Sequence, residues 1–246
     1  MEDFLNQTTT TPILLALLVL FISTFVRSAI GFGDALVAMP LLAMLFGIRT
    51  ATPLVAFVAS TIALTILLTD WRRVELRAAW RLILTSLLGI PFGLVLLKVA
   101  PEPLVKSILG ALLVLYSLYG LFAPRLPFVG SENLAYLFGF ISGLLGGAYN
   151  TNGPPVVIYG ALRRWPPEHF RATLQGCFFV TGLLILAGHG LAGLWTTFVF
   201  KLYLSSLPLV LLAVYVGGKL HRRIPKESFS RIVYAFLLVV GELFLL

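Results

Sequence analysis

The residues best suited to chemistry in this chain form a short polar stretch inside apolar sequence. Residues 143–157 read Gly-Leu-Leu-Gly-Gly-Ala-Tyr-Asn-Thr-Asn-Gly-Pro-Pro-Val-Val. Proline lacks an amide hydrogen and clashes with the preceding turn, and glycine weakens a helix interior, so the pattern predicts a helix break. The polar members, and the start of the short helix that should follow them, are Asn150, Thr151, Asn152, Gly153 and Pro154.

Neutral donors placed before a helix N-terminus are suited to binding an anion. The N-terminal turn of a helix leaves backbone amides free, and proline is well accommodated there. We therefore predict that residues 150–154 contribute to a substrate site for a small anion. The alternative is that this stretch only forms a turn.

A second stretch, residues 28–41, resembles the first and reads Ser-Ala-Ile-Gly-Phe-Gly-Asp-Ala-Leu-Val-Ala-Met-Pro-Leu. A shift of 115 positions places Gly146 on Gly31 and Pro155 on Pro40. We expect the two breaks to face each other and to form one site near the middle of a membrane. Its members in this half would be Ser28, Gly31 and Gly33.

Four further residues could carry chemistry, and each has a structural alternative. Asp34 could couple transport to a proton or cation, because a carboxylate at membrane depth is costly and usually functional; it could equally be the N-cap of the next helix. Gln175 could contact either the substrate or a neighbouring helix. Arg27 could reach an anion, but we expect it to extend to the cytoplasmic interface. His189, between two glycines, is expected in an external loop rather than in a proton relay.

Composition identifies the class of protein and excludes several others. The chain has 246 residues, of which 59% are hydrophobic and 11% charged, with a mean hydropathy of +0.99. Soluble domains carry about a quarter charged residues. The apolar runs do not alternate as barrel strands would, so we predict an all-α polytopic membrane protein. Dispersed histidines, a single cysteine and the absence of a Walker sequence predict no metal site, no cofactor and no enzyme activity.

The net charge of +8 is interpreted as loop charge rather than as a nucleic-acid site. If the 70–81 loop is cytoplasmic and the segments alternate, 14 of the 18 basic residues lie inside and both termini lie outside. This set includes Arg125, Arg222 and Arg223. The basic bias also reverses between corresponding loops of the two halves, as an inverted repeat requires.

Ten apolar segments are predicted within a single transmembrane domain, residues 1–246. About 8–10 of them would be transmembrane helices, and two would be short or broken. A straight span needs about 20 residues, so segments 35–48 and 153–162 could cross or re-enter. An odd number of segments per half indicates two inverted halves, about 12–123 and 133–246. The segments are 12–30, 35–48, 51–69, 82–97, 104–123, 133–149, 153–162, 172–188, 194–217 and 231–246.

The chain resembles the sulfite exporter TauE/SafE family over nearly its whole length, from about residue 12 to the end. The resemblance lies in Gly31-Phe32-Gly33 leading to Pro40, in Gly146-Gly147 followed by residues 152–159, Asn-Gly-Pro-Pro-Val-Val-Ile-Tyr, and in residues 170–174, Phe-Arg-Ala-Thr-Leu. The first motif departs from the family pattern at Asp34 and Ala35, where the family has more glycine.

The resemblance implies a permease of the bacterial plasma membrane that carries sulfite, an organosulfonate or a related sulfur or carboxylate anion. We therefore predict a secondary transporter working by alternating access around the two breaks, with a proton or cation as the coupled partner. An anion channel and a carboxylate transporter of the same fold are the alternatives. The sequence leaves open the anion, the direction, the coupling ion and whether the protein is a homodimer.

Overall fold

A computed structural model describes residues 10–122, 128–221 and 226–245. Within these residues the chain is helical, with one short 3-10 turn, η1 (Trp71–Arg73), and no strand. The helices are α2 (Thr10–Ile30), α3 (Asp34–Phe46), α4 (Ile48–Asp70), α5 (Leu76–Val99), α6 (Glu102–Phe122), α7 (Leu134–Tyr149), α8 (Gly153–Leu162), α9 (Pro167–Leu191), α10 (Thr197–Leu220) and α11 (Lys226–Leu243).

Six of the described helices, α2, α4, α5, α6, α9 and α10, are long and apolar enough to cross a membrane. The predicted all-helical membrane class is therefore confirmed. At about 1.5 Å per residue, α3 with 13 residues and α8 with 10 are too short for a hydrocarbon core of about 30 Å. Helix α7, with 16 residues, is also shorter than a full span, although only segments 35–48 and 153–162 were singled out as short in the sequence.

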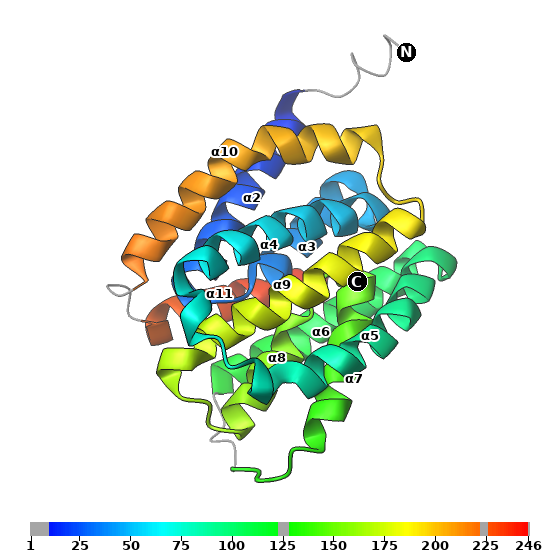
Figure 1. The fold of residues 1–246 in the computed structure, drawn as a ribbon. Coiled ribbons are helices and arrows are strands. Elements are labelled where there is room, and N and C mark those ends of the chain that lie inside the picture. Colours follow the sequence, from blue (N-terminus) through cyan, green and yellow to red (C-terminus); the bar gives the residue numbers. More distant parts are fainter. Residues whose placement is uncertain (1–9, 123–127, 222–225, 246) are drawn as a thin grey trace.

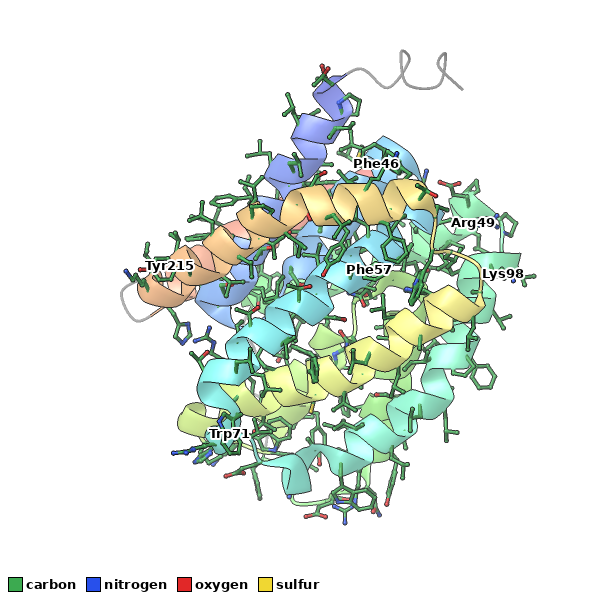
Figure 2. All side chains as sticks on the ribbon, turned by 45° about the horizontal axis from the view of Figure 1, so that its top comes forward. Phe46, Arg49, Phe57, Trp71, Lys98 and Tyr215 are labelled. Carbon is green, nitrogen blue, oxygen red and sulfur yellow. The ribbon has the colours of Figure 1, made fainter. Side chains whose placement is uncertain are left out.

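Apolar and aromatic side chains cover the outside of the bundle, as a lipid-facing surface requires. Leu88, Phe92 and Leu115 are mostly exposed, as is Trp71 at the end of α4. Figure 2 shows Trp71 at the opposite end of the bundle from Arg49, whose guanidinium donates to the Lys98 carbonyl. The loop residues Arg125, Arg222 and Arg223, used above to orient the chain, lie outside the described residues.

Corresponding helices of the two halves make corresponding contacts, so each helix pair in one half has a counterpart in the other. Figure 1 shows α2 and α10 on one side of the molecule, α5 and α7 on the other, and α4 and α9 between them. Helix α2 packs on α10 as α7 packs on α5, and α10 on α4 as α5 on α9, while α4 contacts α9 and α6 contacts α11. Five helices in each half therefore play matching parts.

The structural match between the halves differs from the 115-residue shift predicted above. A shift of 119 takes the start of α3, Asp34, to the start of α8, Gly153, and the start of α4, Ile48, to that of α9, Pro167. Gly31–Gly33 then corresponds to Asn150–Asn152. The shift of 115 was wrong at the breaks because it aligned Pro40 with Pro155, yet Pro40 lies inside α3 whereas Pro155 lies in the first turn of α8.

Both breaks are three residues long and depend on left-handed backbone. Gly31 and Gly33 have φ values of 113° and 102°, which glycine adopts without the clash that a Cβ causes. At the second break Asn150 has φ 55° and forms the C-cap of α7, its amide donating to the Gly146 carbonyl at 2.8 Å. Asparagine is among the few other residues that tolerate this region.

The α5–α7 pair is held together by direct backbone contact. A Cβ on Gly143 would lie 2.1 Å from the Ser86 carbonyl oxygen, and one on Gly93 would lie 2.1 Å from the Leu144 carbonyl oxygen. Ser86 also donates to the Gly139 carbonyl at 2.9 Å. Small residues allow this approach, which stabilises helix pairs in membranes. The helix that leads into the second break is thus firmly fixed on α5.

Candidate functional site

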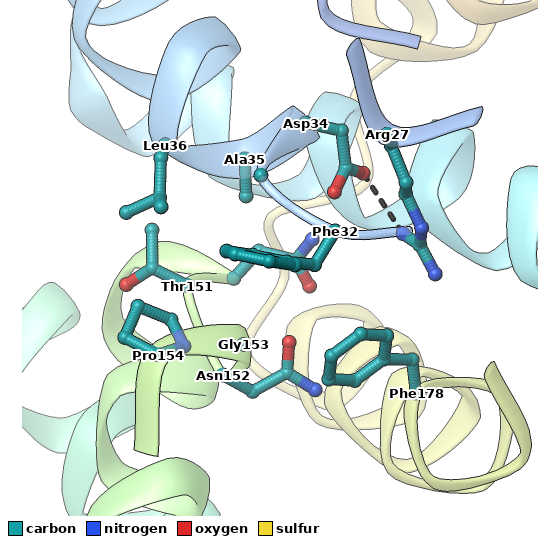
Figure 3. Close-up of a pocket in the computed structure, with 12 residues that line it drawn as sticks. Arg27, Phe32, Asp34, Ala35, Leu36, Thr151, Asn152, Gly153, Pro154 and Phe178 are labelled. Carbon is teal, nitrogen blue, oxygen red and sulfur yellow. Dashed lines mark hydrogen bonds and ion pairs between the residues drawn. The ribbon is translucent and has the colours of Figure 1, made fainter. Parts of the chain in front are cut away.

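The two breaks line one narrow cavity of about 20 Å³. Residues 32–36, from the first break and the start of α3, face residues 150–154, from the second break and the start of α8. Arg27 of α2 and Phe178 of α9 complete the lining, and Figure 3 shows the labelled members converging from these elements. The expectation that the breaks lie together is confirmed.

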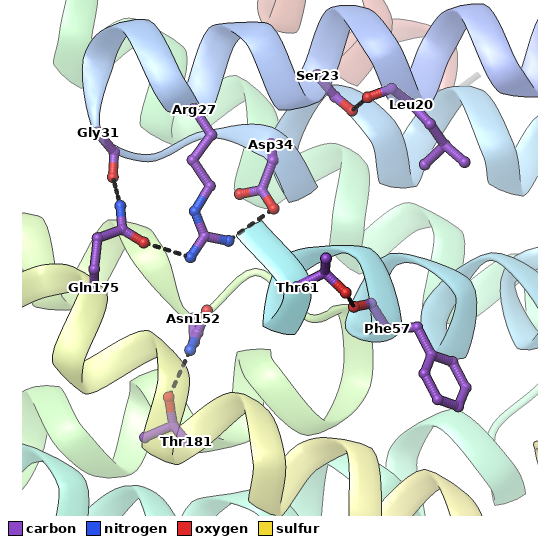
Figure 4. A network of polar contacts seen from close by, with 10 residues as sticks. All are labelled: Leu20, Ser23, Arg27, Gly31, Asp34, Phe57, Thr61, Asn152, Gln175 and Thr181. Carbon is purple, nitrogen blue, oxygen red and sulfur yellow. Dashed lines mark hydrogen bonds and ion pairs between the residues drawn. The ribbon is translucent and has the colours of Figure 1, made fainter. Parts of the chain in front are cut away.

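Arg27 is the centre of a buried polar network (Figure 4). Its Nη1 donates to Asp34 Oδ2 at 2.9 Å and its Nη2 donates to Gln175 Oε1 at 2.8 Å. Gln175 Nε2 donates in turn to the Gly31 carbonyl at 2.7 Å, and the Phe178 ring lies 5.2 Å from the guanidinium carbon. Because Arg27 is only 2% exposed, the expected extension to the membrane interface is wrong. The chain reverses at the break and returns Asp34 to within reach of Arg27.

Asp34 is placed by the same reversal. It is the first residue of α3, whereas Gly33 occupies the N-cap position and no side chain caps that helix by a hydrogen bond. The N-cap alternative is therefore wrong. The carboxylate still lies in the first turn, where a negative charge is favourable, and it neutralises the Arg27 guanidinium. The cavity thus contains one buried positive and one buried negative group.

The second break contributes neutral polar groups of two kinds. Asn152 is fixed within the protein, because its Nδ2 donates to Thr181 Oγ1 at 2.9 Å and its carbonyl accepts from Ser142 Oγ at 2.9 Å. Thr151 Oγ1 is buried and has no hydrogen-bond partner among the described residues. Asn150 lines the cavity and is 4% exposed. Buried polar groups nearly always have partners, so Thr151 leaves a hydrogen-bonding position for a ligand or water.

Backbone amides come more from α3 than from α8. Pro154 and Pro155 have no amide hydrogen, so Gly153 is the single donor among the first three residues of α8. Ala35 and Leu36, at the start of α3, do carry amides and line the cavity. The expectation of free backbone amides at the start of α8 therefore holds, among its first three residues, for Gly153 alone.

The remaining predicted site residues surround the cavity rather than line it. Ser28, Gly31 and Gln175 are not among its lining residues. Gln175 accepts from Arg27 and donates to the Gly31 carbonyl. Its contacts therefore match the neighbouring-helix interpretation. The Ser28 carbonyl accepts from Arg171 Nη2 at 3.1 Å, whereas Ser28 Oγ is buried without a partner in the described part of the chain.

His189 corrects another expectation, because it is fully buried within α9. Its Nε2 lies 3.1 Å from the Gly147 carbonyl. Helix α9 continues to Leu191, and Gly188 brings its backbone so close to α5 that a Cβ there would lie 2.5 Å from a Leu94 methyl carbon. The glycines beside His189 thus serve close packing, although they suggested a loop.

Several site residues were not singled out from the sequence. Phe32, Ala35, Leu36 and Phe178 line the cavity, and Thr181 fixes Asn152. Phe32 was detectable, since an aromatic residue between two glycines in a break has few other packing choices. Phe178 and Thr181 carry no such signal, because they reach the site only through the packing of α9.

Comparison with known proteins gives one family. The family model described as sulfite exporter TauE/SafE matches residues 15–242. No curated protein and no solved structure matched the chain.

Proposed function

The chain belongs to the sulfite exporter TauE/SafE family of membrane transporters, and we propose that it carries sulfite or an organosulfonate across the bacterial plasma membrane by secondary active transport. The observation that supports this most is the single cavity between the two breaks, into which Arg27 points. A guanidinium and neutral donors in a small enclosed space favour an oxyanion.

The anion would be held by groups that can release it again. Arg27 supplies the charge, Thr151 and Asn150 supply neutral side-chain groups, and Ala35 and Leu36 supply amides at a helix N-terminus. Hydrogen bonds to a charged group contribute about 1.5–3 kcal/mol each. A few such bonds replace the anion's hydration without making the complex too stable for transport.

Asp34 gives a route to proton coupling. Its carboxylate accepts from Arg27 Nη1 at 2.9 Å, one of the donors that an incoming anion would use. A second negative charge beside an ionised Asp34 would be repelled in this buried place. When Asp34 takes up a proton, Arg27 becomes free for the anion, so anion and proton bind together. For a monovalent sulfonate, this one-to-one cotransport with a proton moves no net charge.

The two halves would then move around the loaded site. The helix contacts of the two halves match, so each half could adopt the conformation of the other. Inverted-repeat transporters open to alternate sides of the membrane in this way. The same arginine fork also fits a carboxylate, so a carboxylate transporter of this fold is the second candidate.

Binding and flux measurements test the proposal together. Purified protein should be stabilised against heat by methanesulfonate or sulfite more than by acetate, since ligands that bind the native state raise its unfolding temperature. Liposomes that contain the protein and are loaded with unlabelled sulfonate should accumulate labelled sulfonate by counterflow. A carboxylate preference would favour the second candidate, and flux without counterflow would indicate a channel.

Arg27→Lys is the most informative variant for these assays. Lysine keeps the charge but loses the fork that binds Asp34 and Gln175 together. We expect methanesulfonate binding by calorimetry to weaken about ten- to a hundredfold, the effect of losing one charged hydrogen bond. Arg49→Lys, at an exposed arginine outside the cavity, is the matched control. Wild-type affinity in Arg27→Lys would place the anion site elsewhere.

A further inference from the structure

A basic cavity outside the site described above lies where the ends of α4 and α10 meet the start of α9. Its volume of about 550 Å³ is within the range of ligand pockets. Among its described lining residues there is no carboxylate, so an anion in the cavity would meet basic groups and hydroxyls. The polar residues of this lining are Thr65, Thr69, Arg171, Tyr215, Lys219 and His221.

Two of the three basic residues are positioned by the end of α2. Arg171 Nη2 donates to the Ser28 carbonyl at 3.1 Å, and His221 Nδ1 lies within hydrogen-bond distance of the Ala29 carbonyl. Carbonyls in the last turn of a helix have no partner within the helix, and basic groups are favourable there. Capping of α2 therefore accounts for these two residues, but not for the third.

Lys219 is the third basic residue, and its contacts are of another kind. Its Nζ lies 4.2 Å from the centre of the Tyr215 ring, and the side chain is exposed. The ring holds the ammonium beside the cavity by a cation–π contact. Retention of basic residues on the cytoplasmic side explains a lysine in this loop region, but it does not explain why basic groups of α9 and α10 line one cavity.

The surroundings of the cavity are those of a membrane interface. Tyr215 near the end of α10 and Trp71 at the end of α4 are both mostly exposed, and Figure 2 shows them at the same end of the bundle. Exposed aromatic residues of this kind are typical of the headgroup level of a bilayer. Exposed leucines continue from the cavity toward the middle of the same two helices, at Leu64 of α4 and Leu211 of α10.

From this combination we propose that the cavity binds an anionic phospholipid, with its phosphate at Arg171 and Lys219 and its acyl chains along α4 and α10. Arginine and lysine both bind phosphate well, and basic pockets between transmembrane helices on the cytoplasmic side bind lipid headgroups. A free oxyanion would use the same basic groups but leave the leucines beside them uncovered. The site is separate from Arg27 and does not depend on which anion is transported.

Lipid titrations of the purified protein in detergent, followed by native mass spectrometry, measure the site directly. Phosphatidylglycerol should bind more tightly than phosphatidylcholine, whose headgroup carries no net charge. Lys219→Gln should weaken phosphatidylglycerol binding about fivefold, the effect of one basic residue near an anionic lipid. Lys201→Gln, at an exposed lysine near the start of the same helix, is the matched control and should bind as wild type. Equal affinity for the two lipids, or an unchanged affinity in Lys219→Gln, would overturn the inference.

A variant that obstructs the cavity separates a shaped site from a general attraction of charges. Gly218 lines the cavity, and nothing lies within 4 Å of the position of its Cβ, so a large side chain fits the fold there. Gly218→Trp should lose phosphatidylglycerol binding with every basic residue still present, while a thermal scan in phosphatidylcholine checks that the variant folds. Phosphatidylglycerol binding that persists in folded Gly218→Trp would place the lipid elsewhere and contradict the proposal.

Inorganic phosphate distinguishes a lipid from a free anion, because it offers the charged group without acyl chains. It should raise the unfolding temperature of the wild-type protein less than phosphatidylglycerol does. Equal stabilisation by phosphate, lost in Lys219→Gln, would assign the cavity to a free oxyanion and refute the lipid. Methanesulfonate binding should be unchanged in Lys219→Gln, since that lysine does not line the cavity at Arg27.

Discussion

Asn150 has a backbone role and a proposed side-chain role, and most substitutions would disturb both. Its backbone must adopt φ 55° to end α7, and the residue also lines the cavity. Left-handed backbone costs most residues about 1–2 kcal/mol, so Asn150→Ala would weaken folding whether or not the amide binds substrate. Glycine accepts the same backbone without that cost, which makes it possible to remove the side chain alone.

We predict that Asn150→Gly folds with a thermal midpoint near wild type but binds methanesulfonate about ten- to a hundredfold more weakly, because one hydrogen bond to a charged group is lost. Calorimetry measures the affinity, and a thermal scan measures the fold. Asn150→Ala should show both defects. An unchanged affinity in Asn150→Gly would limit Asn150 to its role in the backbone.

The contacts of individual residues were also the part of the site that the sequence predicted least well. The polar character of Asn150–Asn152 and Asp34 was evident, because such residues are rare within apolar runs. The partners of Arg27 were not. Gln175 lies 148 residues away along the chain, and Asp34 reaches Arg27 only because Gly31 and Gly33 reverse the backbone between them. Without that reversal, an arginine near the end of a segment is expected at the interface.

At the scale of the helices, the contact between α5 and α7 supports the second break. The glycines of α7 recur every four residues, at Gly139, Gly143 and Gly147, and all three lie against the backbone of α5. Apolar burial gives little between helices in lipid, so close packing has to hold such pairs together. Loosening this pair would displace Asn150, which follows α7 directly.

Gly143→Ala should therefore destabilise the protein by at least about 1–3 kcal/mol, the usual effect of overpacking, because its Cβ would meet the Ser86 backbone and not a movable side chain. Gly218→Ala is the control, since nothing lies within 4 Å of that Cβ position and alanine favours a helix. The midpoint of thermal unfolding measures both. Equal midpoints for the two variants would contradict the packing described.

The helices themselves were largely predictable, and their ends were not. Ten apolar segments correspond to ten helices in the described residues, because the apolar stretch that spans lipid is what hydropathy detects. Helix α5 begins at Leu76 although its apolar segment begins near 82, since a helix continues through charged residues at the membrane surface. The Gly-based contact of α7 with α5 was not expected, because spacing alone does not identify the partner helix.

At the scale of the whole molecule, the correspondence between the two halves accounts for the arrangement of the breaks. Helices α2 and α7 each end at a three-residue break, and each is followed by a helix too short to span. Their opposite orientation in the membrane stays a prediction from loop charge. It can be tested because the single cysteine, Cys177, is buried and should contribute little background labelling.

Single-cysteine variants at exposed positions decide the orientation. Arg72→Cys and Lys219→Cys should resist an impermeant maleimide in intact cells and react after permeabilisation, whereas Lys98→Cys should react from outside. The physical reason is that cationic residues are retained on the cytoplasmic side. Labelling of Arg72→Cys and Lys219→Cys from opposite sides would refute the inverted arrangement of α5 and α10.

The central claim is that an anion and the Asp34 carboxylate compete for Arg27, and that a proton decides between them. Flux of labelled methanesulfonate into liposomes, driven by an imposed pH gradient and compared with counterflow at equal pH, tests it most directly. Asp34→Asn imitates the protonated side chain and leaves Arg27 free. We predict that this variant keeps counterflow exchange but no longer accumulates sulfonate when a pH gradient is imposed. Accumulation that follows the pH gradient as in wild type would contradict the account.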